Sequence, residues 1–248
     1  MKKPIVSAII VHWNNPSLLK RGLSKLGHPN SLQIIVIDNA SKDRPLWINK
    51  TFPQIVLVQN KENLGYAKAC NQGAQKARGE WLLFLNDDVE IRSKEILKMV
   101  RYCQDYNLDA ASAHSSTKGY EKSLPTILSL LAEFTPFGKF INPPESSTRT
   151  LFGGCLLIKK SVFEKVNGWD EDFYFWFEDA DLTSRLIQNQ FKIGWIPLNV
   201  KHLGGASARQ FTQTQQRKLF FNSMSVYAKK HFSLLGRIIV TLLKFRYT

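Results

Sequence analysis

The fold is decided by one stretch, Gly79-Glu80-Trp81-Leu82-Leu83-Phe84-Leu85-Asn86-Asp87-Asp88-Val89. Its five consecutive apolar residues, 81–85, are typical of a strand that is buried on both faces of a covered sheet. The apolar run ends at Asn86-Asp87-Asp88, and open α/β sheets bind ligands at the carboxyl ends of such strands. Neighbouring carboxylates repel each other unless a positive charge lies between them, and a divalent cation held by phosphate oxygens would supply that charge. A polar turn that only ends the strand is the alternative.

Apolar and amphipathic segments alternate along the chain on both sides of this stretch. Further strands are expected at residues 5–11, 34–37, 55–58, 151–158 and 193–197. Helices are expected at residues 18–26, 66–77, 95–106, 124–134 and 161–166, and after residue 181. This alternation predicts an α/β fold with a mostly parallel central sheet and helices on both faces.

The composition fits one α/β domain or two small ones, because 248 residues with 44% hydrophobic side chains can bury a full core. The three cysteines, Cys70, Cys103 and Cys155, are scattered and odd in number, which argues against a disulfide framework or a metal knuckle. The apolar segment near the N-terminus is short and interrupted by Ser7, so we interpret it as a strand rather than a signal peptide. These features predict a cytoplasmic protein in a reducing compartment.

The net charge of +14 is concentrated toward the C-terminus. No Asp or Glu follows Asp181, whereas eleven Lys and Arg residues do. Apolar pairs recur every four residues, at 234–235, 238–239 and 242–243, with cations between them. Such a helix is too short to span a bilayer, which needs about 20 apolar residues, but it suits the interface of an anionic membrane.

We therefore expect the protein to lie peripherally on the inner face of the cell membrane, and removal of the residues after Lys229 to release it while sparing activity. Two alternatives remain open for the last helix: it packs on the body of the protein, or it pairs two copies as a homodimer. The charge would permit nucleic-acid binding, but no RNA- or DNA-binding motif supports it, so nucleic acid is not an expected partner.

Acidic and amide side chains follow several apolar runs. Asp38-Asn39 follows the strand at 34–37, and Glu178-Asp179-Ala180-Asp181 follows the aromatic run 173–177. A carboxylate beside aromatic side chains is partly desolvated, which raises its pKa toward that of a useful general base. Alternatively, these acids cap the following helix, whose dipole favours negative charge.

Two further segments could contact a ligand. His202 lies in a glycine-rich loop after an expected strand; alone it is structural, but beside a carboxylate cation site it becomes a nitrogen ligand. Asn63-Leu64-Gly65 precedes a helix and could present backbone N–H groups to a phosphate or a sugar. Neither a Gly-x-Gly-x-x-Gly motif nor a Walker lysine motif is present, which disfavours a dinucleotide oxidoreductase or a P-loop enzyme.

Taken in order, these motifs resemble those of family 2 glycosyltransferases of GT-A fold, most closely the rhamnosyltransferase-like branch. The resemblance spans residues 4–230. It rests on residues 6–11 with Asn14, 36–41, 63–67 with Asn71 and Gly73, 85–89, 153–154, 177–182 and His202.

The resemblance implies a role for each matching position. The nucleotide would be contacted by Val11, Asn14, Asp38, Asn63, Gly65, Asn86 and Asp87. Asp88 and His202 would hold Mn²⁺ or Mg²⁺, and Asp179 would be the catalytic base. The acceptor side would be formed by Gly154, Trp176, Glu178 and Asp181. The family's Asp-x-Asp motif falls on residues 86–88, where Asn86 replaces the first acid and leaves Asp88 as the main carboxylate ligand.

The implied activity is inverting transfer of a sugar from a dTDP- or UDP-sugar, with dTDP-rhamnose favoured, to a glycan or lipid-linked saccharide in cell-surface polysaccharide synthesis. The resemblance divides the chain into a nucleotide-sugar-binding half (1–112), an acceptor-binding and catalytic half of the same domain (113–207), and C-terminal basic amphipathic helices (208–248). A catalytically silent module of the same fold that binds a nucleotide or a sugar is the alternative.

Overall fold

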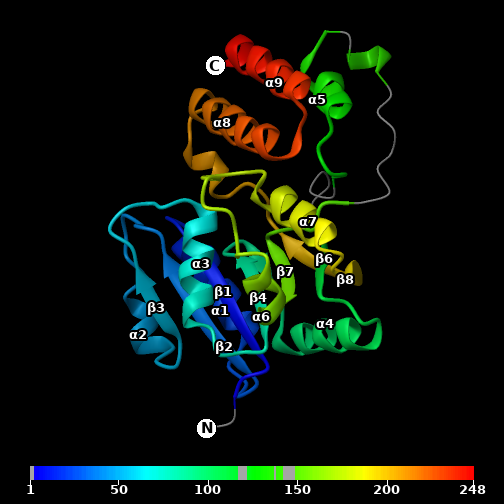
Figure 1. The fold of residues 1–248 in the computed structure, drawn as a ribbon. Helices are drawn as coiled ribbons and strands as arrows, with labels where there is room; N and C mark the ends of the chain where they lie inside the picture. Colours follow the sequence, from blue (N-terminus) through cyan, green and yellow to red (C-terminus); the bar gives the residue numbers. More distant parts are fainter. Residues whose placement is uncertain (1–2, 117–121, 137, 142–148) are drawn as a thin grey trace.

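The computed structural model describes residues 3–116, 122–136, 138–141 and 149–248. Its strands form a single sheet in the order β3-β2-β1-β4-β7-β6-β8-β5 (Figure 1). The strands are β1 (Val6–His12), β2 (Leu32–Asp38), β3 (Val56–Gln59), β4 (Trp81–Asn86), β5 (Val89–Glu90), β6 (Ala110–Ser115), β7 (Cys155–Lys159) and β8 (Ile193–His202).

Strands β3, β2, β1 and β4 run parallel to one another. Beyond β4 the sheet is mixed, because β7 runs antiparallel to both of its neighbours while β8 is parallel to β6 and antiparallel to β5. The expected α/β fold is confirmed, although β5 and β6 were not predicted. The parallel register places His12 opposite Asp38, and Val11 opposite both Ile37 and Asn86, so the polar strand ends meet at one edge of the sheet.

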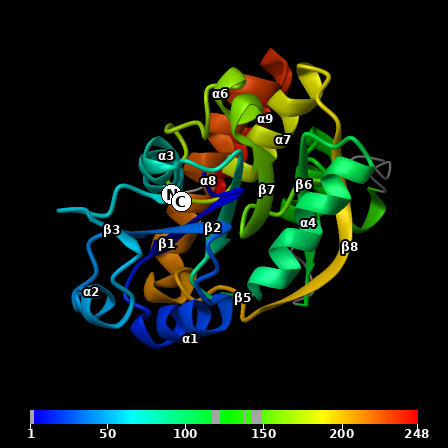
Figure 2. The same cartoon turned by 90° about the horizontal axis from the view of Figure 1, so that it is seen from below.

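Helices cover both faces of the sheet (Figure 2). One core packs under α1 (Pro16–Leu26), α2 (Trp47–Thr51) and α4 (Ser93–Asp105), and the other under α3 (Tyr66–Lys76), α6 (Lys160–Lys165) and α7 (Glu178–Gln188). In β4, Leu83 and Leu85 belong to the first core, whereas Leu82 and Phe84 belong to the second. The apolar run therefore does not alternate with polar residues, because both faces of the strand are covered.

A third apolar cluster lies beyond the carboxyl ends of the strands (Figure 1). It joins α5 (Ile127–Phe134), α8 (Gln213–His231) and α9 (Leu234–Tyr247) to residues of the segment 173–180. The short helices η1 (Gly138–Phe140) and η2 (Ala208–Gln210) follow α5 and precede α8. The C-terminal helices thus pack against the body of the protein, as one of the alternatives from the sequence proposed.

Helix α9 is apolar on two sides. Val240 and Leu243 are buried in the third cluster, whereas Leu235 is 66% exposed and Leu242 is 65% exposed. The expected single apolar stripe is therefore divided between the core and the solvent, because adjacent residues of a helix point in different directions. Within the described residues, no helix combines the length and the apolar character that a membrane crossing requires.

Three element boundaries near the strand ends differ from expectation. Helix α7 begins at Glu178 rather than after Asp181, because Phe177 adopts a left-handed backbone (φ 67°) that ends the irregular segment before it. Strand β8 continues to His202, which pairs with Val89 of β5, so the histidine ends a strand instead of lying in a loop. Residues 151–154 precede β7 rather than forming part of it.

Candidate active site

A cavity of about 210 Å³ opens at the carboxyl ends of β1, β4 and β8. Its walls come from these strand ends, Asn39, Asn63, the start of α3 and three segments at residues 152–154, 174–177 and 205–211, the last of which contains η2. The first two residues of α7 complete the lining. Ligands of open α/β sheets bind at such an edge, so this cavity is the candidate active site.

Each aspartate that follows β4 faces a histidine. Asp87 Oδ2 lies 2.8 Å from Nδ1 of His12, the last residue of β1. Asp88 Oδ1 lies 3.3 Å from Nε2 of His202 at the end of β8. The other ring nitrogen of His202 lies 3.2 Å from the Ser115 hydroxyl, a contact that orients Nε2 toward Asp88. Burial raises the pKa of Asp87, and the contact with His12 opposes that rise.

The acids at the start of α7 have a different environment. The backbone N–H groups of Ala180 and Gly153 donate to the Asp179 carboxylate, yet burial raises the pKa of Asp179 to about 6. Burial and the neighbouring Asp179 raise the pKa of Glu178 to about 8. Both carboxyl groups therefore hold their protons to higher pH than usual, and Asp179, with the lower pKa of the two, is the one better suited to accept a proton near neutral pH.

An unusual backbone presents these two acids. Trp176 and Phe177 both have φ of 67°, in the left-handed region that residues with a side chain rarely occupy. Such a conformation persists only where the surroundings hold it, and it is concentrated at functional sites. The two residues turn the chain abruptly from the aromatic segment into α7 and direct the first turn of the helix toward the cavity.

The cavity wall is strongly acidic. Among the described residues that line it, none is Lys or Arg and four carry carboxyl groups: Asp87, Asp88, Glu178 and Asp179. A diphosphate would be repelled here unless a cation entered with it. Asp88 and His202 present an oxygen and a nitrogen 3.3 Å apart on the same wall, a donor pair that suits Mn²⁺ and, through its oxygen, Mg²⁺.

The protein side chains alone do not complete such a metal site. In the described part of the chain, no three His, Cys, Asp or Glu residues are grouped so that they could hold a metal ion. Asp87, the other acid beside this pair, is engaged by His12. Water and the phosphate oxygens of a bound nucleotide could supply the remaining ligands, so the residues fit a cation that enters together with the donor.

Asn39 organises the loop that precedes α3. Its side-chain amide donates to Asn63 Oδ1 (2.7 Å) and to the Gly65 carbonyl (3.2 Å), and its oxygen accepts from the Leu64 N–H (3.0 Å). Gly65 has φ of 83°, and a Cβ there would lie 2.7 Å from the carbonyl oxygen of Tyr174. Glycine is therefore required where the segment 174–179 crosses the start of α3.

Aromatic side chains form a continuous series along one wall. The ring of Trp13 lies 5.2 Å from that of Phe211, which lies 5.9 Å from Phe175, and Phe175 lies 4.5 Å from Trp176. The Gln210 amide also donates to the Trp13 carbonyl at 2.9 Å. These contacts tie the segment after β8 to the end of β1 and close one side of the cavity.

Most residues predicted from the sequence lie together in this cavity. They are Val11, Asn63, Gly65, Asn86, Asp87, Asp88, Gly154, Trp176, Glu178, Asp179 and His202. Gly154 is needed for this packing, because a Cβ there would lie 2.4 Å from the Phe152 ring and 2.7 Å from the Asn86 amide. The predicted roles of these residues stay predictions, but their proximity is a structural fact.

Three predicted residues are not among those that line the cavity. Asn14 lies beside it and donates from its side chain to Gln210 at 2.9 Å. Asp38 is fully buried, and its carboxylate accepts from the Ser41 N–H at 3.0 Å. Asp181 is 1% exposed and faces away, toward α8.

Several residues of the site were not singled out from the sequence. His12 ends a strand, which is the same signal that identified Asp38 and Asn39. Tyr66, at the start of α3, donates its hydroxyl proton to the Gly153 carbonyl at 2.9 Å. Phe211 lacks a local signal, because only the fold brings it to Trp13 at the other end of the chain.

The family assignment rests on the match of one profile to residues 7–167. The profile described as glycosyl transferase family 2 matches residues 7–167, which is more than half of the chain. The chain belongs to this family. A second profile, described as the N-terminal domain of galactosyltransferase, matches residues 137–205.

Curated relatives of this family 2 glycosyltransferase are themselves named as glycosyltransferases. An N-acetylglucosaminyl-diphospho-decaprenol L-rhamnosyltransferase of Mycobacterium tuberculosis is 24% identical over 237 residues, which cover 79% of this chain and 73% of the relative. A putative teichuronic acid biosynthesis glycosyltransferase, TuaG of Bacillus subtilis, is 28% identical over 169 residues, which cover 63% of this chain and 62% of the relative. The resemblance to rhamnosyltransferases inferred from the motifs is confirmed.

Solved structures show the same fold. The mannosyltransferase PcManGT of Pyrobaculum calidifontis, in complex with GDP-Man and Mn²⁺, has a TM-score of 0.64 at 16% identity and covers 99% of this chain and 70% of its own. S. aureus TarS 1-349 in complex with UDP-GlcNAc has a TM-score of 0.60 at 16% identity and covers 98% of this chain and 71% of its own. At this identity the likeness shows the fold alone, and it confirms the expected GT-A fold.

Proposed function

We propose that this glycosyltransferase moves a sugar from a nucleotide donor to an acceptor hydroxyl in one displacement that inverts the anomeric carbon. One observation carries the proposal: Asp179, whose pKa burial raises to about 6, lies in the same cavity as the Asp88–His202 pair. The two sites provide what the reaction needs, namely a base for the acceptor proton and a place for the leaving phosphates.

In this mechanism, Asp179 takes the proton of the acceptor hydroxyl while the oxygen of that hydroxyl forms a bond to the anomeric carbon. The bond from that carbon to the diphosphate oxygen breaks on the opposite face, so the nucleoside diphosphate leaves and the configuration inverts. The backbone N–H groups of Gly153 and Ala180 hold the carboxylate, and the raised pKa of Glu178 disfavours a second negative charge beside it. Mn²⁺ or Mg²⁺, bound by Asp88 and His202, would neutralise the leaving diphosphate.

The nucleotide half of the donor belongs on the sheet side of the cavity. Val11, Asn63, Gly65, Asn86 and Asp87 line that side, with Asn14 and Asp38 adjacent. We assign residues 1–112 to donor binding and residues 113–207 to the acceptor and the chemistry, with Gly154, Trp176, Glu178 and Asp181 on or behind the acceptor side. The motif resemblance favours dTDP-rhamnose as the donor. The names of the relatives, an L-rhamnosyltransferase for N-acetylglucosaminyl-diphospho-decaprenol and a teichuronic acid biosynthesis glycosyltransferase, support rhamnose and a lipid-linked saccharide in polysaccharide synthesis.

The exposed side of α9 supports peripheral attachment to an anionic membrane. Five apolar side chains on this side are between 50% and 89% exposed: Leu234, Leu235, Ile238, Leu242 and Phe245. The helix also carries Arg237, Lys244 and Arg246 and no acidic residue. An apolar face with cations at its edges suits the interface of an anionic bilayer, where a lipid-linked acceptor would lie.

A donor screen tests the enzymatic proposal. Radiolabelled nucleotide sugars, with and without Mn²⁺, should give transfer or slow donor hydrolysis with one nucleotide sugar, and dTDP-rhamnose is expected. Tight nucleotide binding without turnover on any acceptor would instead identify a catalytically silent binding module.

Co-sedimentation with vesicles tests the membrane proposal. The full chain should sediment with phosphatidylglycerol vesicles at low salt, and Leu242→Glu should release it while leaving its melting temperature unchanged, because Leu242 is 65% exposed. Gln104→Glu on the exposed side of α4 is the matched control, since it adds the same charge away from α9. A full chain that stays in the supernatant would refute the proposal, and dimers that Leu242→Glu dissociates would assign the face to a second copy.

A further inference from the structure

One face of α8 contacts the segment that carries the proposed base. The residues are Ser223, Tyr227, Lys230 and His231, whose spacing of four, three and one places them on the same side of the helix. The segment they contact, residues 170–184, extends on both sides of Asp179. Helix α8 thus lies along the chain that presents the base, although it adds no side chain to the cavity lining.

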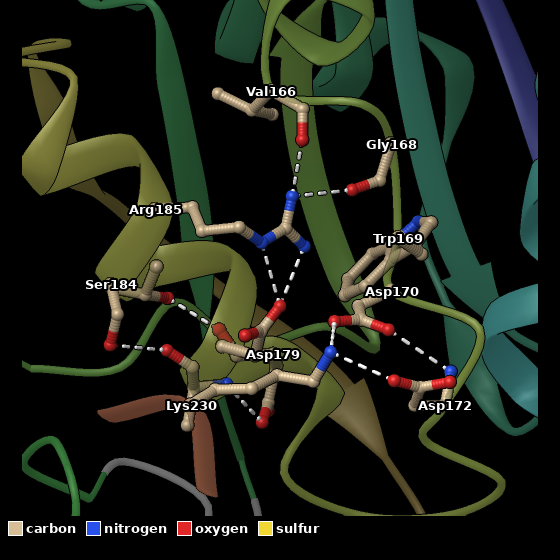
Figure 3. A network of polar contacts seen from close by, with 12 residues as sticks. Val166, Gly168, Trp169, Asp170, Asp172, Asp179, Ser184, Arg185 and Lys230 are labelled. Atoms are coloured by element: carbon tan, nitrogen blue, oxygen red, sulfur yellow. Dashed lines mark hydrogen bonds and ion pairs between the residues drawn. The ribbon is translucent and has the colours of Figure 1, made fainter. Parts of the chain in front are cut away.

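The contacts reach both ends of that segment. Before the base, Lys230 Nζ donates to Asp170 (2.7 Å) and to Asp172 (2.8 Å), as Figure 3 shows. After the base, His231 Nε2 lies 2.8 Å from Asp181 Oδ1. Between these ends, the Ser223 hydroxyl donates to the Phe175 carbonyl at 2.7 Å.

Asp181 connects this face of α8 to the rest of the site. Its carboxylate is 1% exposed, and while His231 engages Oδ1, Arg185 donates to Oδ2 from Nε at 2.7 Å. The same guanidinium also donates through Nη1 to the carbonyls of Val166 and Gly168 (Figure 3). The first turn of α7 is therefore fixed to α8 on one side and to the loop after α6 on the other.

The side chain of Asp179 is itself held less firmly than that of Asp181. Among the described residues, the hydrogen bonds to its carboxylate come from the backbone, at Ala180 and Gly153. Trp176 and Phe177, directly before α7, hold left-handed backbone conformations that persist only under outside constraint. The position of Asp179 is therefore set by whatever holds the first turn of α7 and the segment before it, and α8 contacts both.

We propose that Lys230 and His231 are positioning residues for Asp179, a proposal that rests on the assignment of Asp179 as the base. They hold the two ends of the base-carrying segment through carboxylates that do not line the cavity. The C-terminal helices are then part of the catalytic apparatus. Truncation after Lys229, which the sequence alone presents as harmless to the chemistry, removes both residues and should lower the turnover number.

The test uses the full chain and the nucleotide sugar selected by the donor screen, with water as the acceptor, so that membrane binding plays no part. Lys230→Met and His231→Phe should each lower kcat about 10- to 100-fold, as expected when a catalytic group moves by about 1 Å. The KM of the donor and the Mn²⁺-dependent affinity for its nucleoside diphosphate should stay within about twofold, because these variants leave the sheet side of the cavity intact.

Matched variants separate positioning from simple stability. Lys230→Arg and His231→Gln keep a donor at each site and should restore most of kcat. Lys229→Met removes the same charge from the neighbouring exposed residue and should match the wild type. The Lys230 side chain is 34% exposed, so Lys230→Met should fold. If His231→Phe does not fold, Lys230→Met alone tests the positioning role.

Two results would overturn the proposal. One is a kcat within about twofold of the wild type in Lys230→Met and in every folded His231 variant; the other is a loss of donor affinity in parallel with kcat. Asp179→Asn in the same assay keeps the two proposals apart. If it retains turnover, the assignment of the base fails; if it is inactive while Lys230→Met is not, only the positioning role fails.

Discussion

Asp87 and Asp88 after β4 are buried and each faces a histidine, whereas Glu178 and Asp179 at the start of α7 are partly buried, with backbone N–H groups as the partners of Asp179. In the first pair, burial raises the pKa of Asp87, but the nearby His12 nitrogen opposes that rise. In the second pair, burial raises the pKa of both carboxyl groups, to about 8 for Glu178 and about 6 for Asp179. In the proposed mechanism, this difference lets one acidic wall serve two chemistries: a partnered pair for a cation and its phosphates, and a desolvated pair for proton transfer.

The largest expected effect comes from the desolvated pair. Asp179→Asn should lower transfer about 10²- to 10⁴-fold, the usual loss when a general base is removed. Nucleotide binding should be nearly unchanged, because the partnered pair is intact. Steady-state kinetics with calorimetry of the nucleoside diphosphate measures both quantities, and Asp105→Asn on exposed α4 is the matched control. Transfer within about tenfold of the wild type would mean that Asp179 is not the base.

The partnered pair should show the opposite behaviour. Asp88→Ala and His202→Ala should each weaken Mn²⁺-dependent binding of the nucleoside diphosphate about 10- to 100-fold, a range typical for disturbance of a metal site. In EDTA the variants and the wild type should bind alike. Calorimetry with and without Mn²⁺ measures this, with His28→Ala at an exposed site as the control. Equal affinity of the wild type in Mn²⁺ and in EDTA would refute the metal assignment.

The dependence of kcat/KM on pH tests the role of Asp179 in the wild-type protein, without any substitution. Burial raises the pKa of Asp179 to about 6, so the base is protonated below that pH. The value of kcat/KM should therefore fall about tenfold per pH unit below pH 6 and level off above it. The fall should be measured at saturating Mn²⁺, so that metal loss does not contribute. A profile that stays flat down to pH 4.5 would show that a group with an ordinary carboxyl pKa controls the rate.

The sequence predicted where Asp87 and Asp88 lie, at the end of a buried strand, but not which histidines contact them. The apolar run of β4 identifies the strand end, and the acids there are adjacent in the chain. Their histidines come from the ends of β1 and β8, and which residues meet depends on strand order and register. A residue that ends a strand can be found from the sequence, but its neighbour across the sheet edge cannot.

The surroundings of the desolvated pair were harder to predict. The aromatic run before Glu178 indicated partial desolvation, because five aromatic residues in succession exclude water, and both carboxyl groups have raised pKa values. The contacts of Asp181 with His231 and of Asp170 with Lys230 join residues far apart in sequence, and none has a local pattern. The second apolar side of α9 was missed for the same reason, since only α5 and α8 reveal which side is covered.

The smallest expected effect is on stability, and it bears on Glu178. Its pKa rises from 4.5 to about 8 on folding, because burial and Asp179 disfavour the charged form. Between these pH values the unfolded chain is ionised while the folded protein holds the proton, so the free energy of unfolding falls as pH rises. Glu178→Gln removes this dependence and keeps the shape of the protonated side chain. The melting temperature of the variant relative to the wild type should therefore increase from pH 5 to pH 8.

The melting temperature of Asp179→Asn relative to the wild type should also increase with pH, but over a narrower pH range, because the pKa of Asp179 rises only from 3.8 to about 6. Its advantage over the wild type should stop growing near pH 6, whereas that of Glu178→Gln should continue to grow toward pH 8. Differential scanning fluorimetry across this range distinguishes the two curves. If both differences are independent of pH, the two carboxyl groups are not desolvated in the folded protein, and the contrast with Asp87 and Asp88 fails.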